Sequence, residues 1–144
     1  MGVPRFLTSA ERPADIADAI DGGLHAHNLS HAPLEQVQAL VCAALDDEHR
    51  TLGGVVGRTW GECAEVEQVW VQVAHRRSGL GRTLMQHFEQ EALGRGVRRI
   101  YLSTFSFQAR GFYEKLGYEV VWEVRGFTPE ISKFMMQREL PAST

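Results

Sequence analysis

The sequence has few cysteines and no long apolar segment, and these two absences exclude several classes of protein. Only two cysteines, Cys42 and Cys63, occur in 144 residues, and their spacing matches no metal site. We expect both to be reduced, structural thiols. No apolar run approaches the roughly 20 residues that a membrane helix needs, so no membrane association is expected. The first residues lack a basic segment followed by a long apolar stretch, which favours a cytoplasmic setting.

A large excess of either charge is also missing. The formal net charge is −3, which argues against nucleic-acid binding, because such binding relies on many basic side chains that neutralise phosphates. The arginines are unevenly distributed, with three in the turn 76–82 and three more in the segment 95–99. This clustering suits a small polyanionic ligand, although a solvated basic face explains it equally well from composition alone.

The composition is otherwise that of an ordinary globular protein. The hydrophobic fraction is 44% and the charged fraction 23%, which indicates neither disorder nor a fibrous chain. A chain of 144 residues can bury a core without disulfides or metals. Because the sequence has no internal repeat, low-complexity tract or linker, we expect residues 1–144 to form a single domain.

Apolar periodicity predicts both strands and helices along the chain. The expected strands span residues 4–8, 37–45, 51–60, 64–73, 97–104, 118–124 and 132–140. A first helix is expected from Pro13 to the glycine pair at 22–23, followed by a polar loop to about Leu34. A second helix should run from Gly79 to Gly94 or Gly96, and a third from Gln108 to Leu116.

The segment from 64 to 104 is expected to change from strand to helix and back. Residues 64–73 alternate, which predicts a half-polar strand with Glu65 and Glu67 on one face. A strand, helix and strand of this length form a right-handed unit with parallel strands. We therefore predict an α/β protein of the mixed α+β kind, with a central mixed, mostly antiparallel sheet of six to seven strands. Helices should cover both faces, and the fourth and fifth strands should form the parallel pair.

The residues that open the second helix favour phosphate binding. The turn reads Arg76-Arg77-Ser78-Gly79-Leu80-Gly81 and continues with Arg82 and Thr83. A helix start offers unpaired N–H groups and the positive end of the helix dipole. The glycines let oxygens approach the backbone, the Ser and Thr hydroxyls can donate, and the arginines offset negative charge.

Two other nucleotide-binding turns do not fit these residues. The P-loop of nucleotide hydrolases has a wider glycine spacing and a lysine before its Ser or Thr, where this chain has Arg82 and Thr83. A dinucleotide-binding turn requires three glycines and an acidic residue at the end of the next strand, and neither is present.

A second motif follows one strand later, and with both motifs the chain resembles the GNAT superfamily of N-acetyltransferases. The family's phosphate motif is Gln or Arg, two residues, Gly, one residue, then Gly or Ala, which Arg76, Gly79 and Gly81 satisfy. The segment 109–118, ARGFYEKLGY, is similar to the family's tyrosine-lysine-glycine-aromatic pattern. The resemblance covers nearly the whole chain and implies a GNAT-like fold with acetyl-CoA as cosubstrate and no metal.

The resemblance also implies which residues hold coenzyme A. They are Val71, Val73, Arg76, Arg77, Ser78, Gly79, Leu80, Gly81, Arg82, Thr83, Ser106 and Tyr113. In the family the pantetheine arm runs along the strand before the turn, so Val71 and Val73 should contribute backbone hydrogen bonds. A backbone N–H near Val71 should face the thioester oxygen. Ser106 stands where the family often has asparagine, and its hydroxyl can replace that contact with the arm.

Two kinds of catalytic group are implied. Tyr113 matches the family's general acid, and a phenol of pKa about 10 can protonate a thiolate of pKa about 8.5. Packing of its ring on the sheet is the alternative. Glu67, and after it Glu65, are the candidate bases for the amine, directly or through water. A carboxylate of pKa about 4.3 needs burial or a water relay for this role, and a substrate anchor or a solvated side chain are the alternatives.

The implied activity is acetyl transfer from acetyl-CoA to a primary amine by direct attack in a ternary complex. A non-catalytic acyl-CoA-binding or sensing module is the alternative. His25, His27 and His31 crowd one polar loop, but no further ligand lies at metal-binding spacing, so we expect no metal there. The acceptor stays open between a small-molecule amine and a protein amine. Dimers are common among relatives, so a homodimer is also open.

Overall fold

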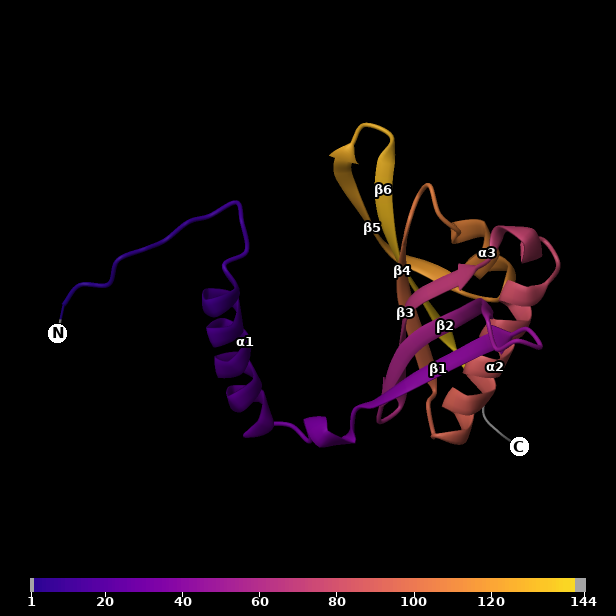
Figure 1. Ribbon diagram of the computed structural model, residues 1–144, viewed down its shortest axis with the longest axis horizontal. Helices are drawn as coiled ribbons and strands as arrows, with labels where there is room; N and C mark the ends of the chain where they lie inside the picture. Colours follow the sequence, from indigo (N-terminus) through magenta and orange to yellow (C-terminus); the bar gives the residue numbers. More distant parts are fainter. Residues whose placement is uncertain (1, 142–144) are drawn as a thin grey trace. The chain divides into compact units, whose positions relative to one another are not determined.

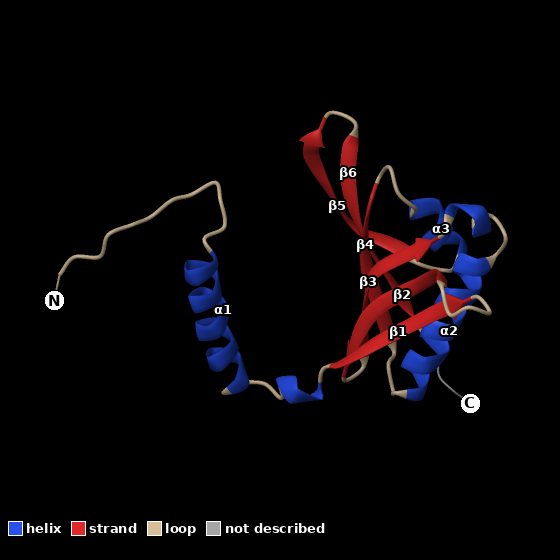
Figure 2. Cartoon of the chain, in the orientation of Figure 1, coloured by secondary structure: helices blue, strands red, loops and turns tan. Residues whose placement is uncertain are grey.

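The structure, a computed structural model, describes residues 2–141 and divides the chain into two compact units, Met1–Glu35 and Gln36–Thr144 (Figures 1 and 2). The first contains one α-helix, and the second contains the sheet with its two packed helices. That the whole chain forms a single domain stays a prediction.

The helix of the first unit is longer than predicted. α1 spans Ala14–Leu29 and runs through the glycine pair at 22–23 that we expected to end it. A helical glycine costs only about 1 kcal/mol relative to alanine, so two of them do not outweigh the turns on either side. Ser30 caps the C-terminal end of α1, and its hydroxyl donates to the carbonyl of His27 over 2.6 Å. The strand expected at residues 4–8 is not formed.

The second unit is built on one six-stranded sheet of order β1-β2-β3-β4-β6-β5. The strands are β1 (Gln38–Leu45), β2 (Thr51–Trp60), β3 (Cys63–Val71), β4 (Arg99–Phe105), β5 (Glu119–Thr128) and β6 (Ile131–Glu139). Only β3 and β4 are parallel among these strands; the other neighbours are antiparallel. The predicted mixed, mostly antiparallel sheet is confirmed. Since residues 4–8 form no strand, the parallel pair is the third and fourth strand rather than the fourth and fifth.

The last two strands form a longer hairpin than predicted. β5 continues to Thr128, where we expected a loop, because β6 pairs with it up to Thr128 opposite Ile131. Only Pro129 and Glu130 remain between the two strands. β5 lies at the edge of the sheet, beside β6 (Figure 1).

α2 (Leu80–Gly94) packs on β1, β2 and β3, and its apolar face forms the centre of the core. Phe88, Met85, Ile100 and Met136 are all fully buried there. The short helix α3 (Arg110–Lys115) connects β4 to β5. No helix within residues 2–141 is both long and apolar enough to cross a membrane.

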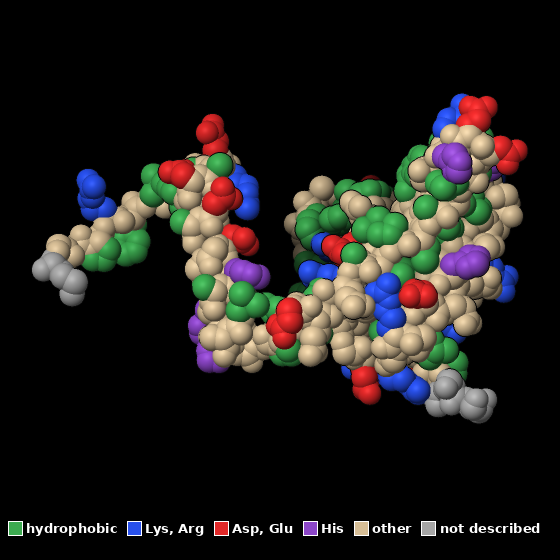
Figure 3. All heavy atoms as spheres, turned by 60° about the horizontal axis from the view of Figure 1, so that its bottom comes forward, with side chains coloured by type: hydrophobic (Ala, Val, Ile, Leu, Met, Phe, Trp, Pro, Cys, Tyr) green, Lys and Arg blue, Asp and Glu red, His purple; other side chains and the backbone are tan. Residues whose placement is uncertain are grey.

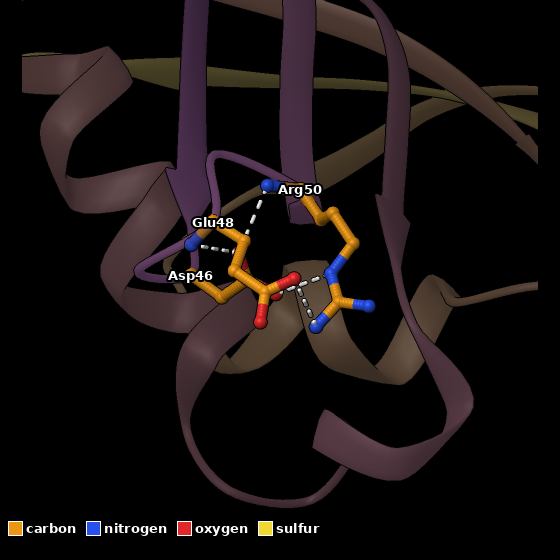
Figure 4. A network of polar contacts seen from close by, with 3 residues as sticks. All are labelled: Asp46, Glu48 and Arg50. Atoms are coloured by element: carbon orange, nitrogen blue, oxygen red, sulfur yellow. Dashed lines mark hydrogen bonds and ion pairs between the residues drawn. The ribbon is translucent and has the colours of Figure 1, made fainter.

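The β1–β2 turn is held by one carboxylate, as Figure 4 shows. Asp46 accepts hydrogen bonds from the backbone N–H groups of Glu48 (2.8 Å) and Arg50 (2.9 Å), and its second oxygen accepts from the Arg50 guanidinium. The Arg50 backbone bond is the main reason why the pKa of Asp46 lies below its usual value. The turn thereby fixes the register of β1 against β2.

Candidate active site

The sheet opens between its two parallel strands. β3 and β4 pair only from Cys63 opposite Arg99 to Val66 opposite Leu102, although both strands continue beyond these residues. Within residues 2–141, the residues of β3 after Val66 have no pairing partner in β4, and at the end of the strand the Val71 carbonyl accepts from Arg76 instead. An extended ligand chain can bind such an edge through main-chain hydrogen bonds.

A β-bulge accompanies this opening. Val56 of β2 pairs with Gln68, and the next residue, Gly57, pairs with Val66, so Glu67 is left without a partner. The bulge corrects the strict alternation that we predicted for this strand. Val66 is buried before the bulge, and Val69 packs on the same core after it, although residues at positions i and i+3 of a regular strand point to opposite faces. A bulge places an extra residue in one strand and re-aims the side chains beside it.

A cavity of about 430 Å³ occupies the opening. Its lining residues are Val66, Glu67, Gln68, Val69, Trp70, Leu102, Ser103, Thr104, Gln108, Ala109 and Tyr113. The structure thus brings the predicted acid and the first-choice base to one cavity. A second cavity of about 580 Å³ is lined by residues of the turn 76–82, called the phosphate turn after its predicted ligand, and by Phe112 and Lys115 of α3. Val69, Trp70 and Ala109 line both, so the two cavities adjoin.

The phosphate turn adopts the conformation that exposes backbone N–H groups. Arg77 and Gly79 have positive φ angles of 62° and 84°. A positive φ is uncommon for a residue with a side chain, and its occurrence next to a helix start is typical of anion-binding turns. The first helical bond joins the Thr83 N–H to the Gly79 carbonyl (3.0 Å), so the N–H groups of residues 80–82 precede the helical ladder.

Some side chains of the turn are already bonded to its own backbone. Arg76 donates from Nε to the carbonyl of Val71 over 2.9 Å, which ties the turn to the end of β3. The hydroxyls of Ser78 and Thr83 donate to the carbonyls of His75 and Gly79. The turn is therefore stabilised by its own side chains, and its free N–H groups are what it offers to an anion.

Tyr113 lies in α3 with its side chain almost completely buried, at 7% exposure. Its ring contacts Phe112 and Tyr118 edge to face, with centroid distances of 5.1 and 5.9 Å. Burial raises the pKa of Tyr113 to about 12, because the phenolate loses its hydration. Tyr113 lines the cavity together with Glu67, and within residues 2–141 no buried side-chain polar atom lacks a hydrogen-bond partner.

The two candidate bases have different surroundings. The carboxylate of Glu65 accepts from Nε of Arg58 (3.0 Å) and lies 2.9 Å from a terminal nitrogen of the same guanidinium. This pairing raises the pKa of Arg58. Glu67 lines the cavity, and no cation within residues 2–141 forms an ion pair with it. Of the two, Glu67 is the carboxylate that is available for a substrate amine.

Other predicted residues lie apart from the cavities. Ser106 accepts a hydrogen bond from the backbone N–H of Ser132 over 3.1 Å and lines neither cavity. Val73 begins a short 3-10 helix and is largely exposed. His25, His27 and His31 belong to the first unit, where α1 includes His25 and His27, and Figure 3 shows histidine side chains on that unit. In the described part of the chain, no three His, Cys, Asp or Glu side chains gather as a metal site.

Sequence reasoning missed several residues that line the cavities. Trp70 lines both and is half exposed. Gln108 accepts from the backbone N–H of Phe105 (2.8 Å) and closes the loop after β4. Lys115 lines the cavity at the phosphate turn. Its place in the second motif was a signal that could have marked it as a partner for phosphate.

Comparison with known proteins shows the family of the chain. Residues 10–118 match the model of the acetyltransferase (GNAT) family, and the chain belongs to that family. It is 29% identical to the blasticidin-S acetyltransferase of Streptomyces morookaense over 109 residues, which cover 75% of this chain and 78% of that protein. A crystal structure of an acetyltransferase from Bacillus cereus superposes with a TM-score of 0.77 at 26% identity, covering 92% of this chain and 98% of its own.

A third relative was solved with the cofactor. It is a protein of Bacillus anthracis assigned as a streptothricin acetyltransferase, in complex with acetyl coenzyme A. It has 22% identity and a TM-score of 0.62, and the match covers 71% of this chain and 62% of that one. This likeness concerns the fold. Acetyl-CoA is the acyl donor of the family to which the chain belongs.

Proposed function

We propose that this protein transfers the acetyl group of acetyl-CoA to a primary amine by direct attack, with Tyr113 as general acid and Glu67 as general base. The observation that carries the proposal is that both side chains line one cavity, which adjoins the cavity of the phosphate turn. An acyl donor held at the turn can thus present its thioester between the acid and the base.

The turn is suited to the pyrophosphate of coenzyme A. The N–H groups of residues 80–82 and the helix dipole favour two negative charges, and Arg77 and Arg82 line the same cavity. From the turn, the pantetheine arm would follow the free edge of β3 toward Val66. Main-chain groups of residues 67–71 would hold it, so side-chain identity at Val71 matters little. We also propose that Val73 and Ser106 contact coenzyme A. Neither residue lines the two cavities, so binding of the cofactor would have to bring them into contact with it.

The reaction then needs no covalent enzyme intermediate. The amine lone pair attacks the thioester carbonyl carbon, and the carbonyl electron pair moves onto oxygen, where a backbone N–H of β3 can stabilise it. The carbon–sulfur bond breaks as the carbonyl reforms. The thiolate takes the proton of Tyr113, and the proton lost by the amine passes to Glu67, directly or through water. The products are an acetamide and coenzyme A.

The raised pKa of Tyr113 has two effects on this step. It keeps the phenol protonated at neutral pH, which a donor requires. It also weakens the acid, since each pKa unit corresponds to about 1.4 kcal/mol. The thiolate charge that develops beside the phenol offsets part of this cost, because a hydrogen bond to an ionised partner is stronger than one between neutral groups.

For the acceptor we propose a small-molecule amine, with a protein amine as the other candidate. The similarity to blasticidin-S acetyltransferase supports the small molecule. Glu67 supplies a negative charge that would attract an ammonium group, and Trp70 supplies an aromatic face in the same cavity.

The test is thiol release from acetyl-CoA with a panel of amines: blasticidin S, a polyamine, free amino acids and a peptide with a free N-terminus. We expect turnover with at least one of them. Tyr113→Phe should lower kcat about 100-fold and leave the affinity for acetyl-CoA unchanged, because the ring and its packing are retained. Tight acetyl-CoA binding without turnover on any amine would instead support an acyl-CoA-binding module.

A further inference from the structure

A buried polar cluster joins α2 and β6 to Tyr118, which lies between α3 and β5, and the proposed chemistry does not use it. Glu89 of α2 is only 7% exposed. Its carboxylate forms an ion pair with Arg138 of β6 and accepts a hydrogen bond from the Tyr118 hydroxyl over 3.4 Å. Burial raises the pKa of Glu89, and Arg138 opposes that rise. Well-packed apolar residues of the same volume often stabilise a fold as well as such a pair does, so stability alone does not explain the cluster.

The cluster reaches Tyr113 through the end of α3. The N–H of Tyr118 donates to the carbonyl of Tyr113, and the N–H of Gly117 donates to that of Glu114, both over 3.0 Å. These two bonds form a Schellman motif, in which an apolar contact between the same two positions is common. Here that contact is the edge-to-face packing of the Tyr118 ring on the Tyr113 ring, with planes 69° apart.

Gly117 allows Arg138 to approach this turn. Its φ of +97° is the left-handed conformation that the motif requires. A Cβ added at this position would lie 3.4 Å from Nε of Arg138. The arginine therefore passes close to the end of α3 on its way to Glu89.

We propose that Tyr118 is a positioning residue, which fixes the ring of Tyr113 relative to α2 through its hydrogen bond to Glu89. This inference rests on the proposed function. α2 is the helix whose N-terminus would hold the pyrophosphate, so the place of the thioester sulfur is set relative to α2. Tyr113 belongs to a different helix of only six residues. The bond from Tyr118 to Glu89 connects the turn that ends α3 to α2, and the ring contact between Tyr118 and Tyr113 passes this constraint on to the acid.

The primary test is Tyr118→Phe, which keeps the aromatic contact and removes only the hydroxyl. Because a displacement of 1 Å can cost about 100-fold in rate, the loss of this one bond should lower kcat about 10-fold. The KM for acetyl-CoA should stay unchanged, since the phosphate turn is untouched. In the Tyr113→Phe background, Tyr118→Phe should lower kcat no further, because a ring without a hydroxyl has no donor to position.

The double-mutant comparison separates positioning from a purely structural role. A structural defect would lower kcat by the same factor in both backgrounds, and that result, like an unchanged kcat in Tyr118→Phe, would overturn the proposal. If Tyr113→Phe itself kept full rate, both the acid role and the positioning role would be lost. If Tyr113→Phe were slow and Tyr118→Phe were not, only the positioning role would be lost.

A second set of variants tests Glu89, whose carboxylate accepts the hydrogen bond from the Tyr118 hydroxyl. Glu89→Ala removes the oxygen that Tyr118 needs and should lower kcat about 10-fold, whereas Glu89→Gln retains an oxygen and should restore kcat to within about threefold of the native enzyme. Glu91→Ala is the matched control, because Glu91 lies on the same helix and, within residues 2–141, forms an ion pair only with Arg95. Equal rates for Glu89→Ala and Glu89→Gln would contradict the proposal.

Discussion

Gly57 occupies a position in β2 where no side chain can be added without moving the backbone. A Cβ at Gly57 would lie 2.2 Å from the carbonyl oxygen of Glu65 and 2.9 Å from two ring atoms of Phe88. Real Cβ atoms do not approach other atoms so closely, and the first neighbour is main chain that cannot rotate away. Gly57 is also the residue at which the β2–β3 register shifts. The β-bulge that opens the active-site cavity therefore depends on the absence of a side chain here.

We expect Gly57→Ala to destabilise the protein by about 3 kcal/mol, the upper end of the range for overpacked cores, because the clash is with backbone. For a chain of this size, that corresponds to a fall in Tm of roughly 10 °C. Acetyl transfer should also fall at temperatures where the variant is folded, since relief of the clash displaces the segment that carries Glu67. Thermal unfolding followed by circular dichroism measures the first effect, and thiol release measures the second.

Gly94→Ala is the matched control for this substitution. Gly94 ends α2, and a Cβ there would have no neighbour within 4 Å. Alanine is the better helix former, so the control should raise the stability by up to about 1 kcal/mol. Our account of the bulge would fail if Gly57→Ala melted within about 2 °C of the native protein or bound and turned over substrates normally.

Three further predictions concern the site itself. Gly79→Asp and Gly81→Asp should each weaken acetyl-CoA binding, measured by calorimetry, because they place a carboxylate beside the pyrophosphate; unchanged affinity in both would refute the placement. Because burial raises the pKa of Tyr113 to about 12, its proton is retained as the pH rises through 10, and kcat should stay level up to about pH 10.5; a loss of rate near pH 10 that Tyr113→Phe abolishes would contradict this. Glu67→Gln should lower kcat/KM at least about 10-fold and Glu65→Gln much less, since Glu65 is paired with Arg58; the reverse order would exchange their roles.

Local patterns predicted the elements that carry the cofactor. The four-residue apolar spacing from Leu80 to Ala92 identified α2, and the glycines before it identified the turn, because both signals lie within one stretch of chain. The motif that identifies Tyr113 as a candidate acid likewise lies within ten neighbouring residues, 109–118. These features depend on sequence neighbours, and so the sequence shows them directly.

The remaining features depend on residues that are distant in sequence. The bulge at Glu67 depends on Gly57 of the neighbouring strand, whose missing side chain leaves room for the Glu65 carbonyl and the Phe88 ring, so alternation within β3 could not reveal it. The extension of β5 to Thr128 depends on pairing with β6. The ion pair that distinguishes Glu65 from Glu67 depends on Arg58 in another strand. α1 is a different case, because there the breaking effect of two glycines was given too much weight.

The short parallel ladder makes the sheet two antiparallel halves, β1-β2-β3 and β4-β6-β5, joined by only four residue pairs. A join of this length is the place where the sheet can separate at the lowest free energy, so amide protons near Val66 and Leu102 should exchange with solvent faster than those inside either half. A donor that lies along the free edge of β3 while contacting α3 would touch both halves at once. Cofactor binding would then act as a cross-link, and slowed amide exchange at this join would report it without any measurement of catalysis.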